Sequence, residues 1–147
     1  MIERRKARQA ALELLYQHDI YGCDLNAAIA RHVRVADAKP IPDFALRLLN
    51  GIAPNHKVID ELIDKNAENW AIERLPLIDR NILRIAIYEM LFEPSIPYSV
   101  SINEAIELAK LFGSAESGKF INGVLGHVAV SLEEETKASS SGKKEAK

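Results

Sequence analysis

The stretch that most constrains the fold runs from Leu77 to Phe92 and reads LIDRNILRIAIYEMLF. Apolar side chains occupy nearly every side of the helix that this stretch would form, and its few polar residues come mostly early. A helix that is apolar all round belongs in the interior of an α-helical protein. Pro76 suits the first turn and Pro94 defines the stop, so we expect the chain to pack around a central helix over 77–92.

Apolar residues at helical spacing predict further amphipathic helices on both sides of the central one. Their expected ranges are 4–20, 25–35, 43–53, 55–70, 101–112 and 114–132. Pro54 is expected to interrupt a helix there, because it removes a backbone hydrogen bond, and Asn55 can cap the restart. Ser101 and Glu104 have the spacing of a capping box, which places a helix start at Ser101. No convincing strand pattern is present, so the sequence predicts an all-α fold of six or seven helices.

The length of 147 residues and the apolar content of 48% suit one domain with a real hydrophobic core. Residues 134–147 lose all apolar periodicity, so we expect them to form a flexible, solvated tail.

The bulk properties exclude several classes of protein. A net charge of −2 does not fit a generally basic nucleic-acid binder, so any basic site must be local. The single Cys23 cannot form an internal disulfide, which favours a reducing compartment. The N-terminus lacks an apolar signal region, and no run of about 18 apolar residues could span a membrane. Together these features predict a soluble cytoplasmic protein that does not associate with membranes.

No catalytic or metal site emerges from the motifs. Residues 113–119, GSAESGK, have the spacing of a phosphate-binding loop as far as its lysine. The match fails because Phe120 stands where a Ser or Thr must reach magnesium, and because a helix precedes the loop instead of a strand. The four histidines are dispersed, without metal-site spacing to one another or to Cys23. We therefore expect no catalytic residue, no metal ion and no cofactor.

The surviving signal is a run of cations near the N-terminus, in which Arg4, Arg5 and Lys6 are followed by Arg8. The arginines gather on one face of the helix expected over 4–20, away from its apolar stripe. Cations at a helix N-terminus oppose the helix dipole, and such uncompensated features often mark function. Arginine binds phosphate through two parallel hydrogen bonds and can stack on bases, which suits unpaired RNA. The run therefore indicates either a solvated helix end or an RNA contact.

Three segments carry a resemblance to a known family: RRKARQAALELLY at 4–16, IDRNILRIAIYEML at 78–91 and IPYSVSINEAIELAKLFGSAESGKFINGVL at 96–125. They closely resemble the NusB family of bacterial transcription antitermination factors, over nearly the whole chain to about Val128. The resemblance implies a single compact domain over 1–133, with small helical bundles over about 1–70 and about 76–133. It also implies that the protein and NusE bind the boxA element of nascent ribosomal RNA, in a termination-resistant complex with NusA, NusG and RNA polymerase.

The resemblance further implies roles for single residues. Those implied in RNA binding are Arg4, Arg5, Lys6, Arg8, Tyr16, Lys119, Phe120 and Asn122. From the sequence alone, core packing of Phe120 is about as well supported as a contact with RNA. Glu116 is implied to restrain RNA affinity by repulsion, and Glu73 and Asp79 are implied to face NusE. The acidic face over 60–68 either attracts that basic ribosomal protein at long range or is merely solvated.

Two other interpretations remain open. A NusB-like helical domain also occurs fused to ribosomal RNA cytosine methyltransferases, so the alternative is an RNA-binding or protein-interaction module associated with rRNA methylation. This chain ends before a cofactor-binding α/β region could begin, so we expect that such catalysis would need a separate polypeptide. The third interpretation is a helical protein-interaction module indifferent to RNA. The sequence also leaves open whether the chain forms a homodimer.

Overall fold

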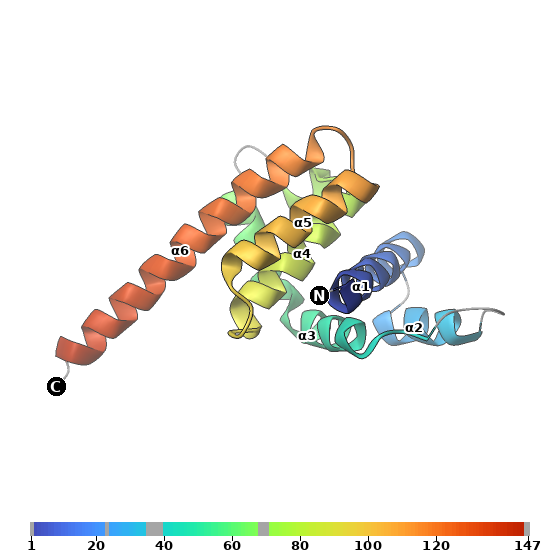
Figure 1. The fold of residues 1–147 in the computed structure, drawn as a ribbon, viewed down its shortest axis with the longest axis horizontal. Helices are drawn as coiled ribbons and strands as arrows, with labels where there is room; N and C mark the ends of the chain where they lie inside the picture. Colours follow the sequence, from blue (N-terminus) through green and yellow to red (C-terminus); the bar gives the residue numbers. More distant parts are fainter. Residues whose placement is uncertain (1, 23, 35–39, 68–70, 146–147) are drawn as a thin grey trace.

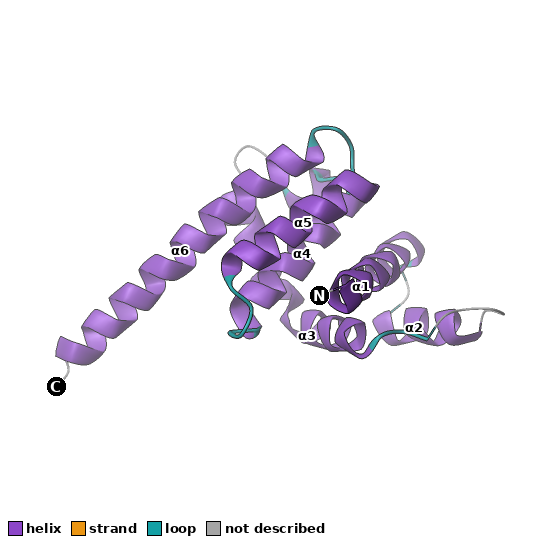
Figure 2. Ribbon diagram, in the orientation of Figure 1, coloured by secondary structure: helices purple, strands orange, loops and turns teal. Residues whose placement is uncertain are grey.

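The computed structural model describes residues 2–22, 24–34, 40–67 and 71–145. Within these ranges the chain forms six α-helices and one short 3-10 helix, η1, and contains no strand (Figure 2). In chain order the elements are α1 (Ile2–Tyr21), α2 (Leu25–Arg34), α3 (Asp43–Asn66), η1 (Ile72–Arg74), α4 (Leu77–Phe92), α5 (Tyr98–Phe112) and α6 (Ser117–Glu145). The predicted all-α fold class is confirmed. Cys23, Val35 and residues 68–70, which entered the expectations above, lie outside the described ranges.

The central position of α4 follows from its sequence. It packs against α1, α3, α5 and α6, because apolar side chains on all its sides need cover. Its fully buried large apolar residues are Ile82, Leu83, Ile85 and Ile87. The helix begins directly after Pro76 and ends before Pro94, as the prolines predict. None of the helices in the described ranges has the length and apolarity needed to cross a membrane.

The helices group around α4 in two sets. α1 packs on α2 and α3, whereas α5 packs on α4 and α6, and Figure 1 shows α1 and α2 on the opposite side of the molecule from α6. One continuous cluster of buried apolar side chains nevertheless runs from Ala7 on α1 to Leu132 on α6. The two sets therefore share one core. The contacts between the sets fix how the surface of one set lies relative to the surface of the other.

α3 continues through Pro54, so the expected interruption there is wrong. The Asn55 side-chain amide donates a hydrogen bond to the Gly51 carbonyl at 2.8 Å, one turn before its own position. Gly51 itself lies so close to the Tyr88 ring of α4 that an added Cβ would overlap the ring. Buried residues lie both before and after the proline: Leu48, Leu49, Ile52, Ile59 and Ile63. This packing outweighs the local cost of about 3 kcal/mol for a proline inside a helix.

The expected start of a helix at Ser101 is also wrong, because α5 begins at Tyr98, directly after Pro97. Ser101 lies inside the helix, 2% exposed, and its hydroxyl donates a hydrogen bond to the Glu89 carboxylate of α4 at 2.9 Å. Glu104 binds Arg5 of α1. The two residues with capping-box spacing therefore connect α5 to other helices.

α6 extends to Glu145, so the expectation that helical structure ends near Leu132 is wrong. The side chains at 133–137 are exposed, and the C-terminal half of α6 projects beyond the other helices in Figure 1. An existing helix adds residues without a new nucleation step, and Glu, Lys and Ala are good helix formers. Apolar periodicity ends where packing ends, whereas the helix itself continues.

Candidate nucleic-acid interface

The first group of cations lies near the N-terminus of α1, where Arg4, Arg5 and Lys6 are exposed. Arg5 donates hydrogen bonds from Nε and Nη2 to the two carboxylate oxygens of Glu104 on α5, at 2.9 and 3.0 Å. These hydrogen bonds, and then the charge of Glu104, raise the pKa of Arg5. The Arg4 guanidinium lies over the Phe44 ring of α3, 4.9 Å from its centroid. All three cations can meet an anion from solvent.

Arg8 does not share this exposed face, so the expected grouping of the arginines is wrong at this position. Its side chain is only 4% exposed, and its Nε and Nη2 each donate to a carboxylate oxygen of Glu89 on α4 at 2.7 Å. The helical period places position 8 beside the fully buried Ala7 and Ala11, facing the core. An arginine there requires a buried acid, which α4 supplies.

Tyr16 extends the exposed surface along α1. It is 38% exposed and follows Arg5 by eleven residues, close to three helical turns. The two side chains therefore point to nearly the same side of α1, separated by about 16 Å along the axis. Tyr16 and Arg5 therefore lie on one exposed strip of α1.

The second group lies at the start of α6, after the loop over 113–116. Lys119 and Asn122 are exposed, as is Glu116 at the end of the loop. Phe120 is half-buried: it packs against the core and also lines an open hollow of about 660 Å³ between α4 and α6. Phe120 therefore packs partly in the core and keeps part of its ring at the surface.

Asp79 is buried, 6% exposed, and does not present a free carboxylate to a partner. It accepts a hydrogen bond from the Ser117 hydroxyl at 2.7 Å, and that hydroxyl accepts one from the Ser114 backbone N–H at 2.9 Å. Asp79 therefore connects α4 to the first residue of α6 and fixes the position of the second group. Glu73 on η1 is exposed.

α5 connects the two groups. Arg5 of α1 binds Glu104 on α5, while Lys119 of α6 shares a hollow with Ile106 and Lys110 of α5. Residues 104 to 110 span about 9 Å of helix, so the two groups flank the same turns of α5. The sequence pattern did not single out Lys110, an exposed cation that pairs with Glu107 at 3.2 Å.

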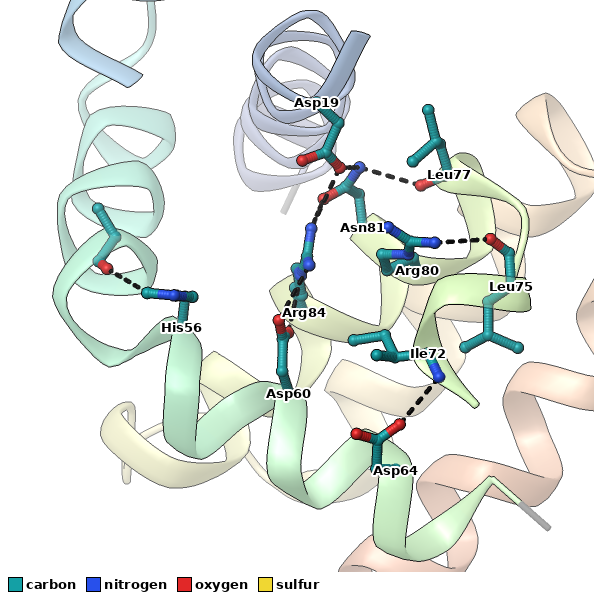
Figure 3. A network of polar contacts seen from close by, with 11 residues as sticks. Asp19, His56, Asp60, Asp64, Ile72, Leu75, Leu77, Arg80, Asn81 and Arg84 are labelled. Atoms are coloured by element: carbon teal, nitrogen blue, oxygen red, sulfur yellow. Dashed lines mark hydrogen bonds and ion pairs between the residues drawn. The ribbon is translucent and has the colours of Figure 1, made fainter. Parts of the chain in front are cut away.

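A polar network joins α1, α3 and α4 close to the other end of α1 (Figure 3). Arg84 donates to both carboxylate oxygens of Asp60 at 2.9 and 3.0 Å and to Asp19 at 3.1 Å. Asn81 donates to Asp19 at 2.8 Å. Burial alone would lower the pKa of Arg84, but the hydrogen bonds and charges of Asp60 and Asp19 outweigh it and raise this pKa.

A signal for these pairs was present in the sequence. Asn81, Arg84 and Glu89 are polar residues inside a stretch that is otherwise apolar all round. A buried polar group needs a partner, so each of them predicts a complementary side chain on a neighbouring helix. The described residues contain no group of three or more His, Cys, Asp or Glu side chains that could hold a metal ion.

Comparison with known proteins identifies the family. Residues 5–130 match the NusB family model. The transcription antitermination protein NusB of Bacillus cereus is 44% identical over 131 residues, which cover 89% of this chain and 100% of the relative. Among solved structures, T. maritima NusB matches with a TM-score of 0.76 at 41% identity, covering 86% of this chain and 89% of its own. A crystal structure of antitermination factors NusB and NusE in complex with dsRNA matches with a TM-score of 0.73 at 27% identity, covering 87% and 96%. The chain belongs to the NusB family.

Proposed function

We propose that this protein is a transcription antitermination factor that binds the boxA element of nascent ribosomal RNA together with NusE. In this role it helps to assemble a termination-resistant complex with NusA, NusG and RNA polymerase. The observation that carries the proposal is family membership over residues 5–130, combined with exposed cations on both sides of α5: Arg4, Arg5 and Lys6 on α1 and Lys119 on α6. The similar structure that holds NusB, NusE and dsRNA supports both partners. The protein acts as a non-enzymatic adaptor in the cytoplasm.

The RNA contacts in this proposal come from both groups. They are Arg4, Arg5, Lys6 and Tyr16 on α1, and Lys119, Phe120 and Asn122 on α6. The cations neutralise phosphates, while the Tyr16 and Phe120 rings offer surfaces on which unpaired bases stack. Arg5 must exchange Glu104 for a phosphate, at little cost, because an exposed ion pair contributes only about 0–1 kcal/mol.

Acidic residues have different parts in the same proposal. Glu116 is exposed beside the second group and restrains RNA affinity through repulsion of phosphates. Glu73 is exposed on η1 and faces NusE. Asp79 acts on the NusE side through the start of α6, which it holds by its hydrogen bond to Ser117.

The test is fluorescence anisotropy of a labelled boxA RNA titrated with this protein, with and without NusE, beside a scrambled RNA of the same length. We expect NusE to tighten binding of boxA far more than binding of the scrambled RNA. The double variant Arg4→Ala with Arg5→Ala should weaken boxA binding without loss of helical content. Its control is Lys57→Ala with Lys137→Ala, which removes two exposed positive charges, one from α3 and one from α6. Equal, weak binding of both RNAs regardless of NusE would refute the proposed function.

A further inference from the structure

We propose that Arg8 and Glu89 form a positioning pair, which sets the placement of α1 for RNA binding without touching RNA. The inference rests on the proposed function, because it concerns how the two cationic groups are held at a fixed spacing. Arg8 belongs to the cationic run near the N-terminus, yet its side chain is only 4% exposed.

The Glu89 carboxylate is the meeting point of three helices. Arg8 of α1 donates from Nε to Oε2 and from Nη2 to Oε1, both at 2.7 Å. Ser101 of α5 donates from Oγ to the same Oε1 at 2.9 Å. The Glu89 side chain is 1% exposed, so both oxygens are satisfied within the protein and neither faces solvent.

A fourth helix joins through an aromatic ring. The guanidinium groups of Arg8 and Arg4 lie 5.5 and 4.9 Å from the centroid of the same ring, Phe44 of α3. Arg5, also within one turn of Arg8, binds Glu104, which follows Ser101 by three residues on α5. The buried arginine and the exposed arginines are thus held by adjoining contacts on the same helices.

The geometry of the pair explains its effect on α1. Two parallel hydrogen bonds between a guanidinium and a carboxylate fix orientation as well as distance. Arg4 and Arg5 lie within one turn of Arg8, so a rotation or slide of α1 would displace them relative to Lys119 on α6. Simultaneous contact of one RNA with both groups requires a fixed spacing between them. The pair therefore acts on RNA affinity through the position of its neighbours.

Direct contact of Arg8 with RNA would demand a different arrangement. Arg8 would have to leave Glu89, and a carboxylate that is 1% exposed would remain without a counter-charge. Such an uncompensated buried charge is strongly unfavourable. The exposed Arg4, Arg5 and Lys6 can meet phosphates without this cost.

Two variants of the full chain distinguish positioning by Arg8 from direct contact of Arg8 with RNA. Each variant is titrated into labelled boxA RNA in the presence of NusE. Arg8→Lys keeps the charge but cannot form two parallel hydrogen bonds, and Glu89→Gln keeps the size but loses the charge. Positioning predicts that each variant weakens binding by about tenfold or more, because the two groups lose their spacing. Direct contact predicts the opposite pattern: Arg8→Lys binds nearly as the unaltered chain, and Glu89→Gln binds more tightly because Arg8 is released.

The dependence of affinity on salt gives a second readout that a loss of stability alone would not change. If Glu89→Gln released Arg8 onto a phosphate, the logarithmic salt slope would steepen by about 0.7 for a single strand. Positioning predicts no steepening. The matched control is Glu134→Gln, which makes the same change in charge at an exposed site on the projecting part of α6 and should not weaken binding.

Circular dichroism verifies that each variant is folded. If either single variant fails to fold, the double variant Arg8→Met with Glu89→Leu replaces it, because apolar residues of similar volume commonly substitute for a buried ion pair without loss of stability. Positioning predicts that this double variant also binds boxA about tenfold more weakly. Binding equal to that of the unaltered chain in these variants, or tighter binding by Glu89→Gln, would overturn the inference alone. If the unaltered chain shows no preference for boxA over the scrambled RNA, the proposed function and the inference are both overturned.

Discussion

Replacing Arg84 by methionine should destabilise the protein, because it leaves two carboxylates without their shared counter-charge. The Arg84 side chain is 13% exposed, and it binds Asp60 and Asp19, which are 17–23% exposed. Removing one partner of a buried ion pair costs about 3–5 kcal/mol. Asp19 and Asp60 are partly hydrated, so we expect the lower end, about 3 kcal/mol. For a chain of this size, that loss lowers the melting temperature by roughly 6–12 °C.

The assay is urea denaturation followed by far-UV circular dichroism, in which an unchanged slope with denaturant shows that the unfolding reaction is still the same one. A triple variant tests the cause. If the cost comes from unpaired charge, adding Asp19→Asn and Asp60→Asn to Arg84→Met should recover part of the lost stability. If the triple variant is instead less stable than Arg84→Met, the cost comes from lost packing or hydrogen bonds, and the electrostatic reasoning is refuted.

Three further predictions follow from the packing and the pKa shifts. Ile85→Ala should lower the free energy of unfolding by about 2–5 kcal/mol through a cavity in α4, and a loss below about 1 kcal/mol in chemical denaturation would contradict the central role of this helix. Gly51→Ala should cost about 1–3 kcal/mol, because the added methyl group overlaps the Tyr88 ring. Gly123→Ala is its control: nothing lies within 4 Å of a Cβ there, so the higher helix propensity of alanine should leave stability equal or higher. Burial, and then the charge of Glu93, raise the pKa of Tyr88, so its phenol should ionise above the usual range of a tyrosine in an alkaline absorbance titration. A raised folded pKa means that the contribution of this phenol to stability is complete below the unfolded value of about 10 and falls as the pH rises towards the folded value. Tyr88→Phe should remove that part of the alkaline loss, and an unchanged pH profile in this variant would contradict the assignment.

Two of the three corrections to the expected elements share one cause, and the third has a different one. Pro54, Ser101 and Leu132 each mark a place where a local rule predicted a helix boundary. α3 continues through Pro54 because its residues on both sides of the proline are buried. α5 begins before Ser101, and the Ser101 hydroxyl, inside the helix, donates a hydrogen bond to Glu89 instead of capping a helix start. α6 continues past the third without any packing signal. Local rules describe the preference of a segment in isolation, and tertiary contacts of a few kcal/mol override them.

Features that depend on neighbours along the chain could be predicted from the sequence. The period of the apolar residues predicted the helices, and the apolar surround of 77–92 predicted which helix is central. The motifs at 4–16 and 96–125 indicated the family. The pattern also correctly placed Arg4 and Arg5 at the surface, off the apolar stripe, but wrongly grouped Arg8 with them.

The partners of the buried polar residues, in contrast, became known from the folded structure. Arg8 meets Glu89 across 81 positions of sequence, and Asp79 meets Ser117 across 38. The period of a helix shows which side chains face inward but not which charge on another helix they will meet. That depends on how the helices rotate and slide against one another, which is set by the packing of all their side chains together. The partner of a buried charge is therefore a property of the whole fold.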